Sequence, residues 1–199
     1  MRVRRAIPDD LLGMAHVHVD TWKTTYRGIV PDRYLDELTY ESDIARGFGR
    51  WIREPTPQWT YLVAVDPANH VIGFAVGGPN RDPDPEFKGE LGAIYVLKES
   101  QGRGVGRVLV REVVRHLLRI GASSMIVWVL EANPYRRFYE KLGGVSVRRR
   151  VVPVAGVPLP EVGYGWKGIT QLAQSRADTA PGGLYQRPAR SMGESDERA

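Results

Sequence analysis

Three glycines, Gly102, Gly104 and Gly106, stand directly before a long amphipathic stretch that predicts a helix. The first backbone N–H groups of a helix have no partner within it, and the helix dipole adds partial positive charge at that end. Glycine leaves such N–H groups uncovered, and it adopts a positive φ without steric cost. This stretch therefore predicts a phosphate-binding loop, with a glycine-rich turn that holds no ligand as the alternative.

Three known phosphate motifs can be compared with this stretch. The Walker motif requires Lys and then Ser or Thr after its last glycine, where Arg107 and Val108 stand here. The dinucleotide motif requires a third glycine at a position that holds Arg107 or Leu109. The pattern Gln-x-x-Gly-x-Gly is present from Gln101 to Gly106, and it resembles the coenzyme A loop of the GNAT superfamily of N-acetyltransferases.

A second stretch, NPYRRFYEKLGG from Asn133, resembles the other signature of this superfamily: an Asn after the fifth strand and a Phe-Tyr pair on the next helix. The resemblance implies that Asn133 hydrogen-bonds the pantetheine arm and that Tyr139 lies beside the thiol. The spacing between them is one residue shorter than the common one. Packing in the core is the alternative, and we expect it for Phe138, because Tyr139 points about 100° away around the helix.

Acetyl-CoA is the co-substrate that the resemblance implies, and its binding site would draw on four parts of the chain. In the family, pantetheine inserts beside the strand that precedes the loop, like an additional strand. The positions expected to bind it are Tyr95, Val96, Leu97, Gln101, Gly102, Arg103, Gly104, Val105, Gly106, Arg107, Asn133 and Tyr139. Arginines continue every four residues as far as Arg119, and we expect those from Arg111 onward to form a solvated helix face.

The resemblance also implies direct transfer of the acetyl group to a primary amine, without an acyl-enzyme. The chain has no cysteine that could form one. Tyr139 is the expected general acid for the leaving thiolate. An alkylammonium must lose a proton before it attacks, and Glu90 is our first candidate for the general base, with Glu131 second. The alternative for Glu90 is that it only begins a strand.

The acceptor side is less clearly marked in the sequence. Trp22 and Tyr26 lie where the superfamily forms its acceptor wall, and they could hold a cationic amine over their rings or simply pack. Three acids in one loop could attract such an amine or merely face water: Asp82, Asp84 and Glu86. The amine itself, whether on a small molecule or a protein, stays open. We expect no metal site, because His16 and His18 face different sides of a helix.

The elements that must position these residues alternate along the chain. Hydrophobic periodicity predicts a strand at 2–7, helical pieces between 9 and 54, strands at 60–66, 70–78 and 90–97, a helix at 104–120, a strand at 124–130, a helix at 133–142, and strands near 146–152 and 158–167. This order predicts an α/β fold with a GNAT-like mixed, mostly antiparallel sheet of about seven strands flanked by helices. We expect one acetyltransferase domain over 1–169 and a flexible tail over 170–199.

Composition sets the limits of these expectations. The 199 residues are 42% hydrophobic and 26% charged, and the formal net charge of +5 favours anionic partners. We expect a cytoplasmic protein that neither spans nor binds a membrane, because cysteine, a signal peptide and a long apolar run are all missing. Two other functions stay open: an acyl-CoA sensor without turnover, and a nucleic-acid-binding module using Arg136–Arg137 and Arg148–Arg150, although no recognition motif accompanies these arginines. A homodimer, frequent in the superfamily, is neither indicated nor excluded.

Overall fold

The computed structural model describes residues 1–46, 52–82 and 84–174. Seven strands form one sheet in the order β1-β2-β3-β4-β5-β7-β6. The elements are β1 (Arg2–Arg5), α1 (Leu11–Thr25), α2 (Asp32–Asp36), α3 (Tyr40–Arg46), β2 (Thr60–Val65), β3 (Val71–Pro79), β4 (Gly89–Val96), α5 (Val105–Arg119), β5 (Met125–Leu130), α6 (Arg137–Lys141), β6 (Val145–Val154), β7 (Val157–Trp166) and α7 (Thr170–Gln174). The expected seven-stranded, mostly antiparallel sheet is confirmed.

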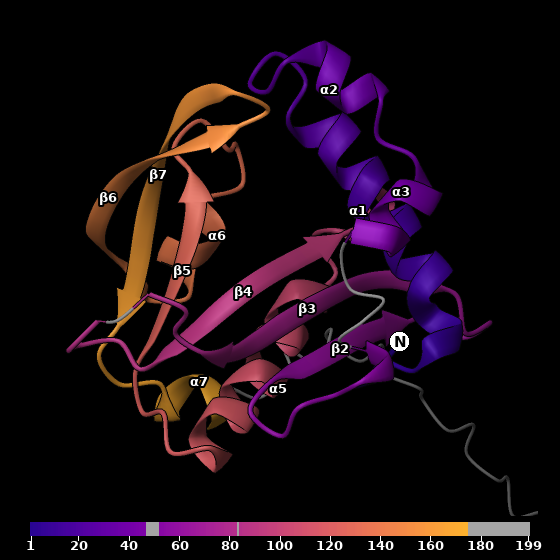
Figure 1. The fold of residues 1–199 in the computed structure, drawn as a ribbon. Coiled ribbons are helices and arrows are strands. Elements are labelled where there is room, and N and C mark those ends of the chain that lie inside the picture. The colour runs from indigo at the N-terminus through magenta and orange to yellow at the C-terminus, as the bar shows by residue number, and fades with distance from the viewer. Residues whose placement is uncertain (47–51, 83, 175–199) are drawn as a thin grey trace, which may run out of the picture.

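The sheet opens in its middle, between β4 and β5. These two parallel strands are paired only at Gly89↔Met125 and Glu90↔Ile126. Beyond these pairs they diverge, so that β1–β4 and β5–β7–β6 form the two arms of a V (Figure 1). The edges of β4 and β5 that face each other across the V therefore have no strand partner among the described residues along most of their length.

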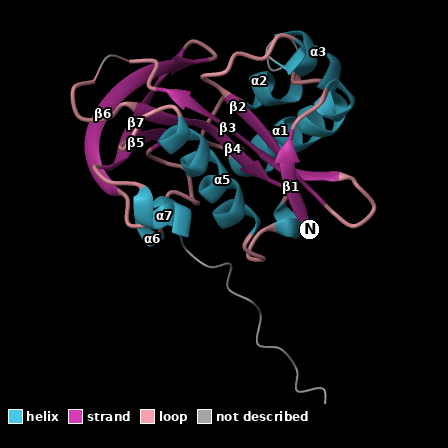
Figure 2. Cartoon of the chain, turned by 90° about the horizontal axis from the view of Figure 1, so that it is seen from below, coloured by secondary structure: helices cyan, strands magenta, loops and turns pink. Residues whose placement is uncertain are grey.

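Helix α5 covers one face of the sheet, and α1, α2 and α3 lie on the other (Figure 2). In α5, the buried side chains recur every four residues and are fully shielded from solvent: Leu109, Val113 and Leu117. The packing is close: a Cβ added to Gly77 in β3 would lie 2.2 Å from the Val113 side chain. Close packing of this helix fixes its N-terminus at the open end of the V.

Helix α1 is held to the sheet by apolar packing and by an ion pair at its start. Met14 and Val17 pack against Phe74 in a buried cluster on this second face. Asp10, directly before the helix, accepts hydrogen bonds from the Arg4 guanidinium at 2.5 and 2.8 Å. These contacts fix the side of α1 that faces the V.

The C-terminal boundary differs from the expectation. Residues 170–174, expected to belong to a flexible tail, form α7, because Leu172 and Ala173 pack against the core beside α5. The rest of the expected tail, 175–199, lies outside the described residues. Within the described part of the chain, no helix has the length and apolar character needed to cross a membrane.

Candidate active site

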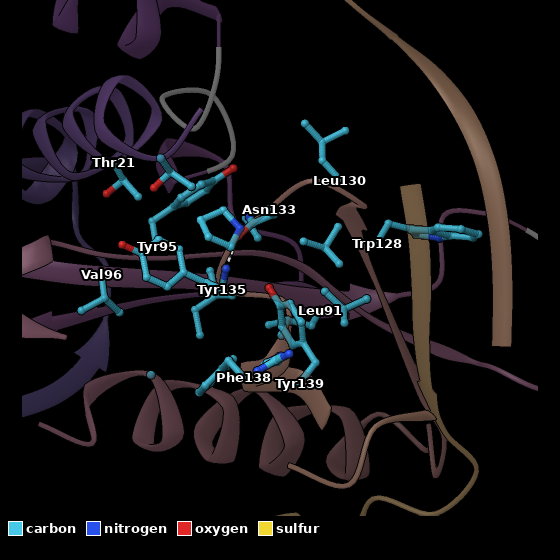
Figure 3. A pocket seen from close by; sticks show the side chains of 18 of the residues that line it. Thr21, Leu91, Tyr95, Val96, Trp128, Leu130, Asn133, Tyr135, Phe138 and Tyr139 are labelled. Atoms are coloured by element: carbon cyan, nitrogen blue, oxygen red, sulfur yellow. Dashed lines mark hydrogen bonds between the residues drawn. The ribbon is translucent and has the colours of Figure 1, made fainter. Parts of the chain in front are cut away.

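A cavity of about 860 Å³ fills the V between β4 and β5. Its walls come from both strands, from the glycine loop and first turn of α5, from α1 and from the α6 region (Figure 3). Residues far apart in the sequence, such as Trp22, Tyr95 and Tyr139, therefore meet in one place. Most of the residues that the sequence assigned to the site line this cavity.

The glycine loop at one end of the cavity leaves backbone N–H groups open. Gly102 and Gly104 have φ values of 71° and 81°, and an added Cβ would meet no atom of the described segments within 4 Å at either position. The first backbone hydrogen bond of α5 joins the Val108 N–H to the Gly104 carbonyl at 3.1 Å. The N–H groups of Gly104 to Arg107 thus have no acceptor among the described residues, and they fit a phosphate group.

Close packing, and not a positive φ, explains why residue 106 is a glycine. A Cβ at this position would lie 3.2 Å from the Phe138 ring. Phe138 packs against the core as expected, and it also lines the cavity. The first turn of α5 and the α6 region are therefore in direct contact, which places Tyr139 close to the loop.

The arginines around the loop divide into two groups. Arg103 and Arg107 are exposed and have no ion-pair partner within the described segments, and Arg107 lines the cavity. Arg115 pairs with Glu112 at 2.5 Å. Arg111 departs from the expected solvated face, because its side chain is only 18% exposed.

Backbone groups of β4 face the opening in alternation. The Leu97 N–H donates to the Ile72 carbonyl of the neighbouring chain segment at 3.0 Å, so Leu97 and Tyr95 direct their backbone groups toward β3. Ile94 and Val96 direct theirs toward the opening, and the Val96 carbonyl accepts from Gln101 Nε2 at 3.0 Å. Ile94 could not be predicted from the sequence, because its direction follows from the pairing of β4 with β3. The Tyr95 side chain still lines the cavity.

Tyr139 reaches the cavity from the short helix α6. Its ring stacks on Tyr164 with ring centres 5.8 Å apart, and only 9% of the residue is exposed. Its hydroxyl points into the cavity, away from α5 (Figure 3), and forms no hydrogen bond with any residue that the structure describes. Burial raises the pKa of the Tyr139 phenol, so the group stays protonated at neutral pH.

Asn133 lies in the cavity, but its carboxamide is already engaged. The Asn133 Nδ2 donates to the Tyr26 hydroxyl oxygen at 2.9 Å, and its Oδ1 accepts from the Tyr135 N–H at 2.8 Å. The expected role of this residue, a hydrogen bond to pantetheine, thus competes with two protein partners. Burial raises the pKa of the Tyr26 phenol, against the opposing effect of the hydrogen bond from Asn133.

The aromatic side chains of α1 pack with one another along the wall. The rings of Trp22 and Tyr26 lie 4.8 Å apart, and Trp22 Nε1 donates to the Tyr95 hydroxyl at 3.1 Å. Both Trp22 and Tyr26 line the cavity, as the sequence analysis expected for an acceptor wall. Ring contact at an interplanar angle of 54° joins the two side chains, and each has its own hydrogen bond, Trp22 to Tyr95 and Tyr26 to Asn133.

Glu90 lies at the closed end of the V and is almost fully buried. Its carboxylate accepts from Arg81 Nη2 at 2.5 Å, from Arg81 Nε at 2.9 Å and from the Arg81 N–H at 3.1 Å. Glu131, the second candidate base, is not among the residues that line the cavity, and it pairs with Arg149 at 3.3 Å. Glu90 is therefore the better placed of the two, although Arg81 holds it.

A further carboxylate, Glu161 of β7, also lines the cavity. It accepts from Arg150 Nε at 2.8 Å, and the Arg150 guanidinium lies 4.0 Å from the ring centre of Trp128. Glu161 could not be predicted from the sequence, because nothing in its local sequence distinguishes it. Its place in the cavity depends on the pairing of β7 with β5, where Glu161 lies opposite Leu130.

The three acids of the loop between β3 and β4 have partners. Asp82 pairs with Arg150, Asp84 and Glu86 both pair with Arg148, and Glu86 also pairs with Lys167. The loop is thereby tied to β6, and its acids are not simply solvated. Because these acids are already paired with cations, the ion pairs argue against the expectation that the acids attract an amine.

Comparison with known proteins identifies the family. The model of the acetyltransferase (GNAT) family matches residues 10–144, which is more than half of the chain. The chain belongs to the GNAT family of acetyltransferases. It is 40% identical over 170 residues to an uncharacterized N-acetyltransferase, YuaI, of Bacillus subtilis (strain 168), an alignment that covers 85% of this chain and 95% of that protein. The resemblance to the GNAT superfamily stated from the sequence is thus confirmed.

Other GNAT relatives support the same assignment. A probable N-acetyltransferase of Mycobacterium tuberculosis, Rv2775, is 30% identical over 177 residues, covering 82% of this chain and 92% of the relative. The crystal structure of a GCN5-related N-acetyltransferase from Rhodopseudomonas palustris has a TM-score of 0.64 at 20% identity, covering 82% of this chain and 93% of the other. The fold and the GNAT acyltransferase class are therefore shown. Among the described residues of this GNAT chain, no group of three or more His, Asp or Glu side chains could hold a metal ion.

Proposed function

We propose that this protein transfers the acetyl group of acetyl-CoA directly to a primary amine of a small molecule or a protein. One observation carries the proposal: the V between β4 and β5 has free N–H groups of α5 at one end and the buried Tyr139 hydroxyl inside it. Two solved structures with the same fold contain the implied ligand: PaiA N-acetyltransferase of Thermoplasma acidophilum with coenzyme A (TM-score 0.58) and yncA of Salmonella typhimurium with acetyl-CoA (TM-score 0.58).

The donor would be held mainly by backbone groups. The N–H groups of Gly104 to Arg107 supply four hydrogen-bond donors for a diphosphate, and the Arg107 side chain adds a positive charge. The backbone of Ile94 and Val96 faces the opening and can pair with pantetheine as a neighbouring strand would. Acetyl-CoA supplies a thioester, which is already activated toward attack by an amine.

Tyr139 is the proposed general acid. As the amine nitrogen bonds to the acetyl carbon, the carbon–sulfur bond breaks and the departing sulfur takes the phenolic proton. A phenol suits this role only while it is protonated, and burial raises the pKa of Tyr139. The hydroxyl forms no hydrogen bond to a described residue that would hold it away from the sulfur.

Glu90 is the proposed general base for the attacking ammonium. A carboxylate has about four lone-pair positions. Arg81 uses three of these in the structure, two on Oε2 and one on Oε1. The remaining position on Oε1 can accept the amine proton, directly or through one water molecule, while Arg81 keeps the carboxylate in place.

A sensor that binds acyl-CoA without turnover is the second candidate, and the fold alone does not exclude it. Tyr139 and Glu90, both in the cavity, favour the enzyme. A role in nucleic-acid binding has less support, because Arg148, Arg149 and Arg150 all have acidic partners. The absence of cysteine fits a reducing cytoplasm as the site of action.

A thiol-release assay with acetyl-CoA and a panel of amines tests the proposal. The panel contains polyamines, amino acids, aminoglycosides and a peptide with a free N-terminus. We expect coenzyme A to appear with at least one amine, and an acetylated product of the matching mass. Acetyl-CoA that raises Tm while no amine is acetylated would support the sensor, and no binding of acetyl-CoA at all would refute both.

A further inference from the structure

The orientation of the Asn133 carboxamide is fixed by one neighbouring group. Its Oδ1 lies 2.8 Å from the backbone nitrogen of Tyr135. A backbone N–H can only donate, so the oxygen of the carboxamide must be the atom on that side. The Nδ2 must then be the atom that lies 2.9 Å from the Tyr26 hydroxyl. Asn133 therefore donates to Tyr26, and the reverse bond is excluded.

The Tyr26 hydroxyl consequently keeps its own proton free. Its oxygen accepts from Asn133, and no residue in the described ranges accepts its O–H. Only 8% of Tyr26 is exposed, and its ring is held against Trp22. A buried O–H without an acceptor is costly, so a ligand oxygen in this cavity would complete the set of hydrogen bonds.

The cavity that Tyr26 lines is the one that Tyr139 enters, and Asn133 lines it as well. An attacking amine must direct its lone pair at the acetyl carbon, so a hydrogen bond donated to its nitrogen would block the reaction. The remaining acceptors of the reacting group are the carbonyl oxygen and the sulfur, and oxygen accepts the stronger hydrogen bond. The carbonyl oxygen also gains negative charge as the amine attacks, which increases the value of a donor placed there.

We propose that Tyr26 is a second phenol donor in the reaction, whose O–H hydrogen-bonds the acetyl carbonyl oxygen, and that Asn133 is the positioning residue that turns this proton into the cavity. This inference rests on the proposed function, since it requires acetyl-CoA in the V. It assigns Tyr26 a role other than the cation–π contact or packing expected from the sequence, and it replaces the expected contact of Asn133 with pantetheine. Tyr139 is left to serve the sulfur.

The inference depends on which residue donates the hydrogen bond between Asn133 and Tyr26, and a substitution can reverse that direction. Asn133→Asp preserves shape and still accepts from the Tyr135 N–H. The introduced carboxylate oxygen accepts from Tyr26 instead of donating to it, so the phenolic proton turns out of the cavity. If the Asn133–Tyr26 bond served only to join α1 to the loop after β5, this substitution would leave the bond, and the site, intact.

The experiment measures the carbonyl resonance of acetyl-CoA, 13C-labelled at the carbonyl, bound to the full-length protein without any amine. In the wild type we expect this resonance to move downfield of its position in free acetyl-CoA. Tyr26→Phe and Asn133→Asp should each remove most of that displacement. Tyr164→Phe is the matched control, because its buried hydroxyl already donates to Glu140 at 2.8 Å, and we expect it to leave the displacement unchanged.

Kinetics with any amine accepted in the thiol-release assay give a second measurement. Tyr26→Phe should lower kcat by roughly 10- to 100-fold, somewhat below the loss typical for a complete oxyanion-hole donor, while the KM for acetyl-CoA changes little. Asn133→Asp should lower kcat by a similar factor although it retains every hydroxyl.

Three results would overturn the inference. Tyr26→Phe could bind acetyl-CoA with the carbonyl resonance and kcat of the wild type. Asn133→Asp could do the same, which would reduce the bond to a structural tie. A wild-type protein that binds no acetyl-CoA would refute the proposed function and this inference together, and is distinguished by the absence of any bound resonance.

Discussion

The two halves of the cavity are built from different chemical groups. The donor half, formed by the β4 edge and the loop and first turn of α5 (residues 101–107), presents mainly backbone N–H and C=O groups. The acceptor half, formed by α1, the ends of β5 and β7 and the closed end of the V around Glu90, presents side chains already bonded to one another, as Trp22 is to Tyr95 and Asn133 to Tyr26. Under the proposed function, backbone groups bind the donor and side chains surround the acceptor amine.

Charge divides the two halves in the same way. Arg103 and Arg107 in the donor half have no acidic partner in the part of the chain that the structure describes, which suits the phosphates of coenzyme A. In the acceptor half, the two carboxylates of the wall are paired with arginines, Glu90 with Arg81 and Glu161 with Arg150. Under the proposed function, cations in the donor half that are unpaired among the described residues suit the phosphates of the donor, and the paired charges of the acceptor half leave shape and hydrogen bonds to select the amine.

Tyr139 lies where the two halves meet, and its loss should have the largest effect. Tyr139→Phe removes only the hydroxyl and should lower kcat by roughly 10- to 1000-fold, while the Kd of acetyl-CoA stays within about a factor of three. Steady-state kinetics and calorimetric titration measure the two quantities. If Tyr139→Phe had the kcat of the wild type, the Tyr139 hydroxyl would not be the general acid. The two halves would then have no catalytic residue in common.

Glu90 belongs to the acceptor half and should give a pH-dependent loss. Glu90→Gln should lower kcat/KM by about 10- to 100-fold at neutral pH, because the acceptor is then an ammonium that needs a base. The loss should shrink as the pH approaches the amine pKa of about 10.4, where the acceptor deprotonates without help. Glu161→Gln is the matched control, since it removes a second cavity carboxylate that also has an arginine partner. A pH-independent loss in Glu90→Gln would instead indicate a binding role.

Gly104 tests the donor half alone. Its φ of 81° is unfavourable for any side chain by about 1 to 2 kcal/mol, so Gly104→Ala should displace the loop and weaken acetyl-CoA binding by about 10-fold. The KM for the amine should not change. Gly121→Ala, at the other end of α5 with a φ of 84°, carries the same strain far from the cavity. The control should lower Tm to a similar extent and leave the Kd of acetyl-CoA as it is; equal weakening by both variants would contradict a specific role for the loop.

Asp10 tests how the acceptor half is anchored, and its effect should be the smallest on activity. Burial alone would raise the pKa of Asp10, but hydrogen bonds from Arg4 and the Ile7 N–H outweigh it and lower that pKa below its usual value. The carboxylate therefore stabilises the fold above pH about 3.9, and this contribution is lost as the pH falls through the lowered pKa. Asp10→Asn should lower the free energy of unfolding by about 1 to 3 kcal/mol at pH 7. Urea unfolding at several pH values should show wild type and variant converging in acid, and a constant difference would contradict this reasoning.

Much of the donor half could be predicted from the sequence because its signals are local. Gly102 and Gly104 stand before an amphipathic helix. The positive φ of a glycine and the unpartnered N–H groups of a helix start both depend on neighbouring residues. Ile94 was missed only because the phase of the β4 hydrogen bonds is set by its pairing with β3. The side to which each residue of a strand directs its backbone groups depends on the neighbouring strand, even where the strand itself is predicted correctly.

The acceptor half could not be predicted to the same degree. Glu161 enters the cavity through strand pairing, Arg81 reaches Glu90 through a loop, and Asn133 bonds Tyr26 across 107 residues of chain. No local pattern marks such contacts, because they depend on which surfaces the folded elements bring together. The acids 82, 84 and 86 show the same effect, since their partners lie on β6 and beyond β7.

The sequence by itself determined the order of strands and helices, the glycine loop at the mouth of α5 and the pair of motifs that mark the family. Periodicity, backbone conformation and helix capping act over a few residues, so they can be read along the chain. Only the tertiary structure decided which buried groups donate and which accept: that Arg81 holds Glu90, and that Asn133 turns the hydroxyl of Tyr26. A hydrogen bond requires its two partners within about 3 Å, and that proximity is created by folding.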